Sequence, residues 1–151
     1  MPTTAPEPAE PRSAGPALSS ELRIAVMRLA RRMRQERATD TYTMSQLSAL
    51  ATLEREGALT LGALAAAEKV QPPSMTRIVA SLEQAGLVRR TPHPTDGRQI
   101  HLAATPAGVK LLAADRLRRD AWLAKRLAEL NVDERATLHD AAEILGRLAQ
   151  S

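Results

Sequence analysis

Residues 90–108, RTPHPTDGRQIHLAATPAG, restrict the possible folds more than any other part of the chain. Asp96-Gly97 is a strong signal for a tight turn, because glycine accepts backbone angles that a side chain disfavours. Short β-favouring runs flank this turn, so the stretch predicts a hairpin that carries Arg98 at its tip. A hairpin of this size is not stable alone and has to pack against other elements.

The rest of the chain shows helical spacing of apolar residues, with helix-capping residues at the expected ends. The predicted order is helix, helix, short helix, helix, hairpin, long helix, helix. Two closely linked helices followed by a hairpin describe a winged helix-turn-helix. The predicted fold class is therefore mainly α (an α+β winged helix-turn-helix), with six helices and a small β-hairpin wing. The predicted helix starts are Ser19 or Ser20, Thr43, Thr60, Pro72, Thr105 and Asn131 or Asp133, and Gly57 and Gly86 follow two of the helix ends.

Composition and pattern divide the chain into four parts. Residues 1–17 are rich in Pro and Ala and predict a disordered tail. Residues 18–38 predict the first helix, residues 43–104 the winged helix-turn-helix lobe, and residues 105–151 the C-terminal helices. The tail lacks the apolar core of a signal peptide, and no apolar run approaches the roughly 18 residues that span a bilayer. We therefore expect a cytoplasmic protein with no membrane partner.

The charge of the chain fits an anionic partner. The net charge is +4 at pH 7, and most of the cationic side chains are arginine. With one Trp, one Tyr and no Phe, the chain lacks the rings that modules stacking single-stranded bases require. The absence of Cys excludes disulfides and thiolate metal sites.

No motif in the chain indicates catalysis. His93, His101 and His139 lack the spacing of metal ligands. Neither a glycine-rich phosphate loop nor a nucleophile signature is present. We expect a protein that is not an enzyme, with no metal site and no cofactor.

The helix predicted from Pro72 onward has two different faces. Its large apolar residues fall within one arc of about 100°, the width of a buried stripe. The opposite face is small and polar and carries one cation, so it can approach a major groove closely, with the helix N-terminus toward phosphate. The apolar residues are Met75, Ile78, Val79 and Leu82, and the candidate DNA-contacting residues are Pro72, Pro73, Ser74, Thr76, Arg77 and Ala80.

Arg77 is the candidate reader of base sequence. An arginine can donate two hydrogen bonds to the O6 and N7 atoms of guanine. The alternative is an ion pair between Arg77 and a neighbouring carboxylate such as Glu83 or Asp96. That pair would hold the guanidinium away from DNA.

The hairpin would lie over the DNA backbone beside this helix, where a narrow minor groove attracts arginine. We expect Arg98 to enter that groove, with its guanidinium held by a charge-assisted bond to Asp96. Thr60 is a candidate helix cap and phosphate contact. The candidate wing residues are Arg89, Arg90, His93, Asp96, Gly97 and Arg98, of which the first two would meet phosphates.

From Leu18 onward the chain resembles the multiple-antibiotic-resistance regulator (MarR) family of winged-helix repressors. The most specific part is SMTRIVASLEQAGLVRRTPHPTDGRQIHLAATPAG, where the family pattern T-R-x-V-x-x-L-E-x-x-G-L-V-x-R leads into D-x-R and an apolar strand. One departure is LAATPAG, which has an extra Ala where the family more often has Leu-Thr directly. The matching residues are Thr76, Arg77, Val79, Leu82, Glu83, Gly86, Leu87, Val88, Arg90, Asp96, Arg98, Leu102, Thr105 and Gly108.

The resemblance implies a homodimer, built from the first helix and the C-terminal helices, that binds a pseudo-palindromic operator. It also implies repression that is relieved by a small aromatic or phenolic effector. Without Cys, the peroxide-sensing branch of the family is out of reach. The apolar residues of the C-terminal helices fit such a dimer, with an intramolecular core as the competing use for some of them; they are Leu112, Leu117, Trp122, Leu127, Leu130, Leu138, Ile144, Leu145 and Leu148.

An effector pocket is the least defined expectation. Its candidate lining includes two methionines, because Met adapts to guests of varied shape, and ordinary packing is the alternative. The function expected from all these features is that of a sequence-specific repressor of transcription. The competing hypotheses are a non-specific DNA-coating or architectural protein and a helix-rich adaptor. The candidate pocket residues are Met27, Arg31, Met44 and Leu47.

Overall fold

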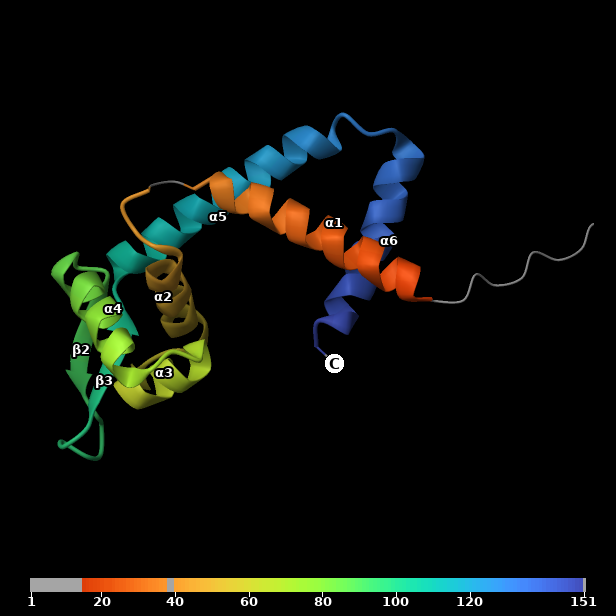
Figure 1. The fold of residues 1–151 in the computed structure, drawn as a ribbon. Coiled ribbons are helices and arrows are strands. Elements are labelled where there is room, and N and C mark those ends of the chain that lie inside the picture. Colours follow the sequence, from red (N-terminus) through yellow and green to blue (C-terminus); the bar gives the residue numbers. More distant parts are fainter. Residues whose placement is uncertain (1–14, 38–39, 151) are drawn as a thin grey trace, which may run out of the picture. The chain divides into compact units, whose positions relative to one another are not determined.

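The computed structural model describes residues 15–37 and 40–150. These residues form six helices and one three-stranded antiparallel sheet (Figure 1), which confirms the mainly α winged helix-turn-helix prediction. The chain divides into two units, Met1–Gln35 and Glu36–Ser151. The elements are α1 (Pro16–Gln35), α2 (Met44–Glu56), β1 (Leu59–Thr60), α3 (Leu61–Glu68), α4 (Pro72–Gln84), β2 (Val88–Pro92), β3 (Ile100–Ala104), α5 (Pro106–Leu127) and α6 (Val132–Leu148).

The first unit contributes one described helix, α1. It begins at Pro16, ahead of the predicted start at Ser19 or Ser20, because proline suits the first helical turn, where its missing N–H has no intrahelical partner. Residues 1–14 of the predicted tail and residues 38–39 of the predicted first helix lie outside the described residues. None of the residues of α1 is buried.

Capping side chains begin four of the five helices of the second unit where the sequence predicts, and the fifth, α4, begins at Pro72 without a side-chain cap. Thr43 forms a capping box with Gln46: its Oγ1 accepts from the Gln46 N–H at 3.2 Å, and the Gln46 side chain accepts from the Thr43 N–H at 2.7 Å. Thr60 caps α3, Thr105 caps α5, and Asn131 rather than Asp133 caps α6. Within the described ranges, none of the helices has an apolar stretch long enough to cross a bilayer.

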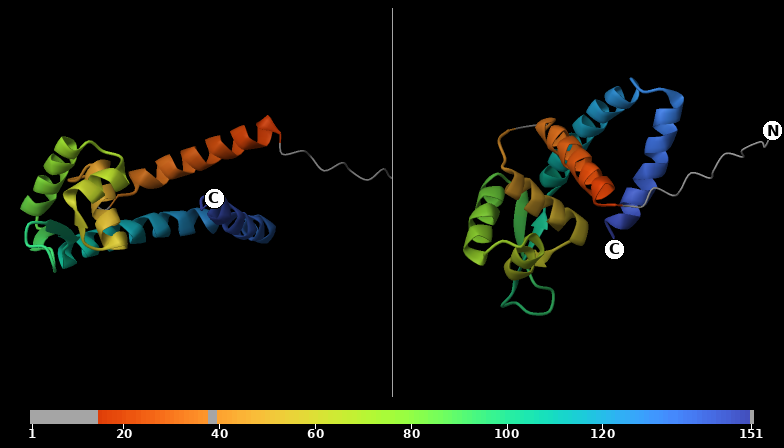
Figure 2. Two further views of the ribbon diagram at one scale, coloured as in Figure 1. Left: turned by 90° about the horizontal axis from the view of Figure 1, so that it is seen from below. Right: turned by 45° about the vertical axis from the view of Figure 1, so that its right-hand side comes forward.

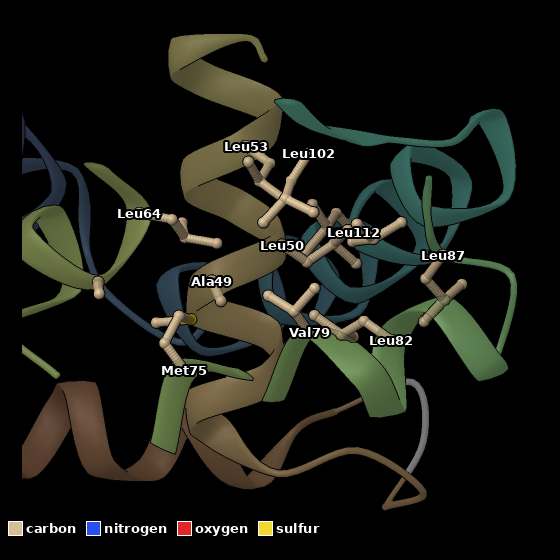
Figure 3. Packing of buried hydrophobic residues seen from close by; sticks show 12 residues of the cluster. Ala49, Leu50, Leu53, Leu64, Met75, Val79, Leu82, Leu87, Leu102 and Leu112 are labelled. Carbon is tan, nitrogen blue, oxygen red and sulfur yellow. The ribbon is translucent and has the colours of Figure 1, made fainter. Parts of the chain in front are cut away.

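Aliphatic side chains from α2, α3, α4, the sheet and the start of α5 form the core of the winged lobe, residues 44–104 (Figure 3). Leu50, Leu64 and Leu82 have no exposed surface, and each such burial contributes about 1.5–3 kcal/mol. Leu112 of α5 is also buried in this core, so the intramolecular alternative is correct for that residue. The core residues are Ala49, Leu50, Leu53, Leu64, Ala65, Met75, Val79, Leu82, Leu87, Val88, Leu102 and Leu112.

The sheet has one strand more than the predicted hairpin. β3 lies between β1 and β2, and Leu59 pairs with Leu102 in the register of β1. A strand as short as β1 carries no alternating pattern that a sequence reading could detect. Its second residue, Thr60, is also the cap of α3.

The turn predicted at Asp96-Gly97 is present, but it lies within a longer loop and does not use a positive φ at Gly97. The strands end at Pro92 and resume at Ile100, so residues 93–99 form a wider loop. Gly97 is not among the residues with positive φ, which include Gly57 and Gly86. The Gln99 N–H closes this turn by donating to the Asp96 carbonyl at 3.0 Å.

Gly108 allows α5 to pack closely against the end of the α4–β2 turn. A Cβ atom at this position would lie 2.5 Å from the Leu87 carbonyl oxygen and 2.9 Å from a methyl carbon of Leu50. Thr105, just before α5, donates from its hydroxyl to the Gly86 carbonyl at 2.6 Å and from its N–H to the Leu87 carbonyl at 2.9 Å. The start of α5 is therefore fixed to the segment that joins α4 to the wing.

Gly108→Ala should destabilise the protein by about 1–3 kcal/mol, because the methyl group would overlap backbone atoms that cannot move independently. Gly62→Ala is the matched control, since a Cβ atom at Gly62 meets nothing within 4 Å and Ala favours a helix. Urea unfolding at one fixed protein concentration measures both variants. Equal stability of the two variants would contradict the close approach at Gly108.

An ion pair joins α2 to α5. The guanidinium of Arg116 and the carboxylate of Glu54 form a bidentate ion pair, with one N–H···O distance of 3.1 Å. The hydrogen bond from Arg116, together with its charge, lowers the pKa of Glu54 below the ordinary 4.5, although partial burial opposes the shift. The side chain of Arg116 is 54% exposed, so solvent screening limits the strength of the pair.

Because the folded-state pKa of Glu54 is lowered, this pair stabilises the fold above the carboxyl's unfolded pKa and ceases to do so as the pH falls through its folded pKa. Glu54→Gln should therefore reduce the free energy of unfolding by about 0.2–1 kcal/mol at neutral pH. In acid it should have no effect, because protonated Glu54 is then as uncharged as the glutamine that replaces it. Urea unfolding at both pH values tests this. Glu56→Gln, in the surface pair with Arg55, is the control, and a loss for Glu54→Gln that does not change with pH would refute the prediction.

Candidate nucleic-acid interface

The two faces of α4 lie as the sequence predicts. Met75, Val79 and Leu82 are completely buried, whereas Ile78 is half-buried. This packing turns the opposite face to solvent. The exposed residues include all the candidate DNA contacts on this helix: Pro72, Pro73, Ser74, Thr76, Arg77 and Ala80.

The guanidinium of Arg77 has no hydrogen-bond or ion-pair partner among the residues that the structure describes. Both carboxylates considered as alternatives are engaged elsewhere. Glu83 pairs with Arg90, and Asp96 accepts from a backbone N–H of the wing. The intramolecular alternative for Arg77 is therefore wrong, and its charge faces solvent from the middle of α4.

The N-terminus of α4 offers fewer free donors than expected for a phosphate site. Pro72 and Pro73 have no N–H group. The next two N–H groups, of Ser74 and Met75, both donate to the Gln71 carbonyl at 3.0 Å. The hydroxyl of Thr76 donates to the Pro72 carbonyl at 2.9 Å, which leaves its oxygen as an acceptor. Contacts at this end therefore depend on side chains and on close approach.

The side chain of His93 holds the loop of the wing by accepting hydrogen bonds from its backbone. Its Nδ1 atom accepts from the Asp96 N–H at 3.1 Å and from the Thr95 N–H at 3.2 Å. Its ring meets the ring of His101 edge to face, with centroids 4.5 Å apart. This structural role was not evident in the sequence, because it depends on the loop being wider than a tight turn. Contact of His93 with DNA stays a prediction.

Asp96 holds the backbone of the wing rather than the arginine side chain. Its Oδ1 atom accepts from the Arg98 N–H at 3.1 Å, a contact typical of Asp in turns. The expected bond from Asp96 to the Arg98 guanidinium is therefore wrong. The guanidinium of Arg98 is exposed and makes no ion pair within the described ranges. In Figure 2 the loop that carries Arg98 projects beyond the ends of β2 and β3.

The two arginines at the base of the wing have different surroundings. They are neighbours on β2, so their side chains lie on opposite faces of the sheet. Arg90 forms an ion pair with Glu83 of α4, with Nε and Oε1 2.7 Å apart. Arg89 has no such partner within the part of the chain that is described. Phosphate contacts by either residue stay predictions.

Side-chain hydrogen bonds hold the three helices of the lobe together. The Gln46 amide on α2 donates to the Ser81 hydroxyl on α4 at 2.8 Å. The carboxylate of Glu68 on α3 accepts from the hydroxyls of Ser48 and Thr52 on α2, at 2.6 and 2.5 Å. Sequence reasoning missed these contacts because they join residues far apart in the chain. The first bond fixes α4 on α2, and the two bonds to Glu68 fix α3 on α2. Thr60 caps α3, and its phosphate contact stays a prediction.

Part of the predicted effector pocket coincides with a cavity of about 190 Å³ between α2 and α5. Met44 and Leu47 line it from α2. Met27 and Arg31 lie on α1, in the other unit, so the complete four-residue pocket stays a prediction. Asp115, which the sequence analysis did not single out, is almost fully buried in the lining and pairs with Arg119 one turn further along α5.

Comparison with known proteins gives a consistent result. Residues 42–100 match the model of the MarR family. An HTH-type transcriptional regulator of Mycobacterium bovis is 51% identical over 128 residues, which cover 85% of this chain and 90% of that protein. The HTH-type transcriptional repressor MdtR of Bacillus subtilis is 29% identical over 138 residues, 89% of this chain and 87% of that protein.

A solved structure supports the same assignment. The crystal structure of a transcriptional regulator from Pseudomonas aeruginosa superimposes with a TM-score of 0.82 at 33% identity, covering 93% of this chain and 99% of that one. These relatives are regulators of transcription and not enzymes. The exposed recognition face of α4, the wing beside it and these similarities lead to one conclusion: the chain belongs to the MarR family of winged helix-turn-helix transcriptional regulators.

Proposed function

We propose that this regulator is a cytoplasmic homodimer that represses transcription by binding a pseudo-palindromic operator. Each protomer places α4 in a major groove and its wing at the neighbouring minor groove. The observation that carries the proposal is a pair of guanidinium groups that have no partner among the described residues, Arg77 on the outer face of α4 and Arg98 on the projecting loop.

The face around Arg77 suits base recognition. Ala80 lies one turn after Thr76 on the outer face, and their small side chains let the helix approach base edges closely. An arginine with no carboxylate partner loses no ion pair when it meets guanine. The guanidinium can therefore donate both hydrogen bonds that distinguish guanine from the other bases.

The wing suits the minor groove and the phosphate backbone. Its loop is held by the contacts of His93 and Asp96, so its backbone is ordered before DNA binds. Only the side chain of Arg98 then has to adjust. A narrow minor groove has a strongly negative potential, which favours an inserted arginine without requiring a particular base.

The unburied helices support a dimer. No residue of α1 or of α6 is buried, yet both helices carry large exposed apolar side chains, such as Leu29 on α1 and Ile144 on α6. Amphipathic helices in proteins depend on packing of an apolar face for most of their stability. A second copy of the chain supplies that packing. On α6 and the adjoining part of α5 the exposed residues are Leu117, Val132, Leu138, Ile144 and Leu148.

Repression and its relief by a small effector are the finer parts of the proposal. The B. subtilis relative is named as a repressor. The cavity at Met44 and Leu47 is smaller than the roughly 300–1,000 Å³ of typical ligand pockets, so it suits a small aromatic or phenolic molecule. The Nε atom of Arg119 in its lining is buried without a hydrogen-bond partner among the described residues, and an oxygen of the effector would satisfy it.

A non-specific DNA-coating protein is the alternative function. It would bind operator and random duplexes equally well, whereas a specific reader binds its site at least about 10³-fold more tightly than random DNA. The exposed and unpartnered state of Arg77 favours the specific reader, because a coating protein needs cations toward phosphate and none toward base edges.

Arg77→Ala and Arg98→Ala should have different effects. Arg77→Ala should cost about 1–3 kcal/mol, chiefly at one base pair of the site, because it removes a bidentate contact to a base. Arg98→Ala should weaken binding to all sequences and reduce the slope of log K against log salt by about 0.9. Gel-shift titrations at several salt concentrations measure both effects, on a selected duplex, its single-base variants and random DNA.

Lys125→Ala, near the end of α5, removes a cation outside the proposed interface and is the control. Identical behaviour of the Arg77 and Arg98 variants on every duplex would show that the two arginines do not have separate roles. If all three variants matched the wild-type protein, the surface of α4 and the wing would not be the DNA-binding face.

The dimer should protect two half-sites whose centres are about one helical turn apart, roughly 34–36 Å. Footprinting on the DNA upstream of the protein's own gene, with sedimentation of the free protein, measures the site and the oligomeric state. A protected stretch without twofold symmetry, or a monomer at concentrations that give full protection, would contradict the proposed arrangement.

A further inference from the structure

The ion pair between Glu83 and Arg90 joins the recognition helix to the wing. Four arginines belong to α4 and the wing, namely Arg77, Arg89, Arg90 and Arg98, and among the described residues only Arg90 of these has a carboxylate partner. Its Nε atom lies 2.7 Å from Oε1 of Glu83. Glu83 is in the last turn of α4 and its side chain is only 26% exposed, so the carboxylate is well placed to hold the pair.

The register of the sheet explains why this arginine and not its neighbour meets Glu83. Arg90 lies opposite Leu102 on β3, and residues directly opposite in an antiparallel pair share one face of the sheet. Leu102 is almost completely buried in the core between sheet and helices. Arg90 is therefore on the helix-facing side of β2, where α4 ends, and Arg89 is on the other side.

The pair changes how much of the wing's charge DNA can attract. Attraction between cations and phosphates is independent of base sequence and accounts for almost all non-specific affinity. A carboxylate beside Arg90 offsets one such cation. The same contact holds β2 against the end of α4, so that the wing and the recognition helix keep one relative position.

We propose that Glu83 is a specificity-determining positioning residue: it withholds Arg90 from phosphate and fixes the wing to the recognition helix, so that discrimination by Arg77 is not masked by non-specific binding. This inference rests on the DNA-binding function proposed above. It assigns to an acidic residue at the DNA-facing surface a role in selectivity and none in contacting DNA.

The test compares Glu83→Gln with Glu129→Gln. Both changes remove one negative charge from an ion pair, but Glu129 pairs with Arg126 at the end of α5, outside the proposed interface. The probes are a pool of random-sequence duplexes and one duplex selected from that pool by the wild-type protein. For Glu83→Gln we expect tighter binding to the random pool, a salt slope steeper by about 0.9, and a severalfold lower ratio of specific to random affinity. Glu129→Gln should leave the salt slope and this ratio unchanged.

A second variant tests whether the extra salt slope comes from the released charge of Arg90 or from a general loss of structure. In Glu83→Gln/Arg90→Gln the released cation is absent, so the extra salt slope of the single variant should disappear. Persistence of the extra slope in the double variant, a slope for Glu83→Gln equal to that of Glu129→Gln, or weaker random-pool binding by Glu83→Gln would each overturn the inference while leaving the proposed function intact. Failure of the wild-type protein to bind any duplex in a salt-dependent way would overturn both.

Discussion

The burial of one face of α4 is the constraint on which the rest of the arrangement depends. Met75, Val79 and Leu82 have no exposed surface, and they pack against leucines of α2 and α3 in a single core (Figure 3). Because a helix that buries one face must present the other, this packing alone determines which residues face solvent. The charge of Arg77 is thus positioned by its apolar neighbours rather than by contacts of its own.

Around that core, short polar contacts align the elements that would meet DNA. The Gln46–Ser81 bond fixes α4 on α2, and the Glu83–Arg90 pair fixes the wing on α4. The Thr105 hydroxyl then ties the start of α5 to the turn that precedes the wing. The long helix α5 is consequently coupled to the wing through backbone carbonyls, without a flexible linker. A displacement of α5 would therefore be transmitted directly to α4 and the wing.

The sequence predicts the helices well, because their signals are local. Thr43, Thr60, Thr105 and Asn131 all cap the helices expected of them, and the buried stripe of α4 follows from its spacing. Prediction fails where the outcome depends on contacts across the fold. The wing is wider than Asp96-Gly97 suggests because His93 organises the loop from its first position. The two-residue strand β1 exists only through its pairing with β3.

The candidate site also has some features that local sequence predicts and others that depend on contacts across the fold. The identity of the exposed residues on α4 follows from helical periodicity, whereas the partner of Glu83 does not, because Arg90 lies on a different element. No local rule joins a helix residue to a strand seven positions later. The buried pair of Asp115 and Arg119 was likewise overlooked, although its spacing on α5 is a recognisable one-turn ion pair.

The central claim is that two arginines of one protomer engage adjacent grooves of a duplex. A crystal structure of the protein with a selected duplex tests it most directly. The account predicts the Arg77 guanidinium within hydrogen-bond distance of a guanine edge in the major groove, and the Arg98 guanidinium inside the neighbouring minor groove. Either side chain turned back onto a carboxylate of its own protomer, while DNA is bound, would contradict it.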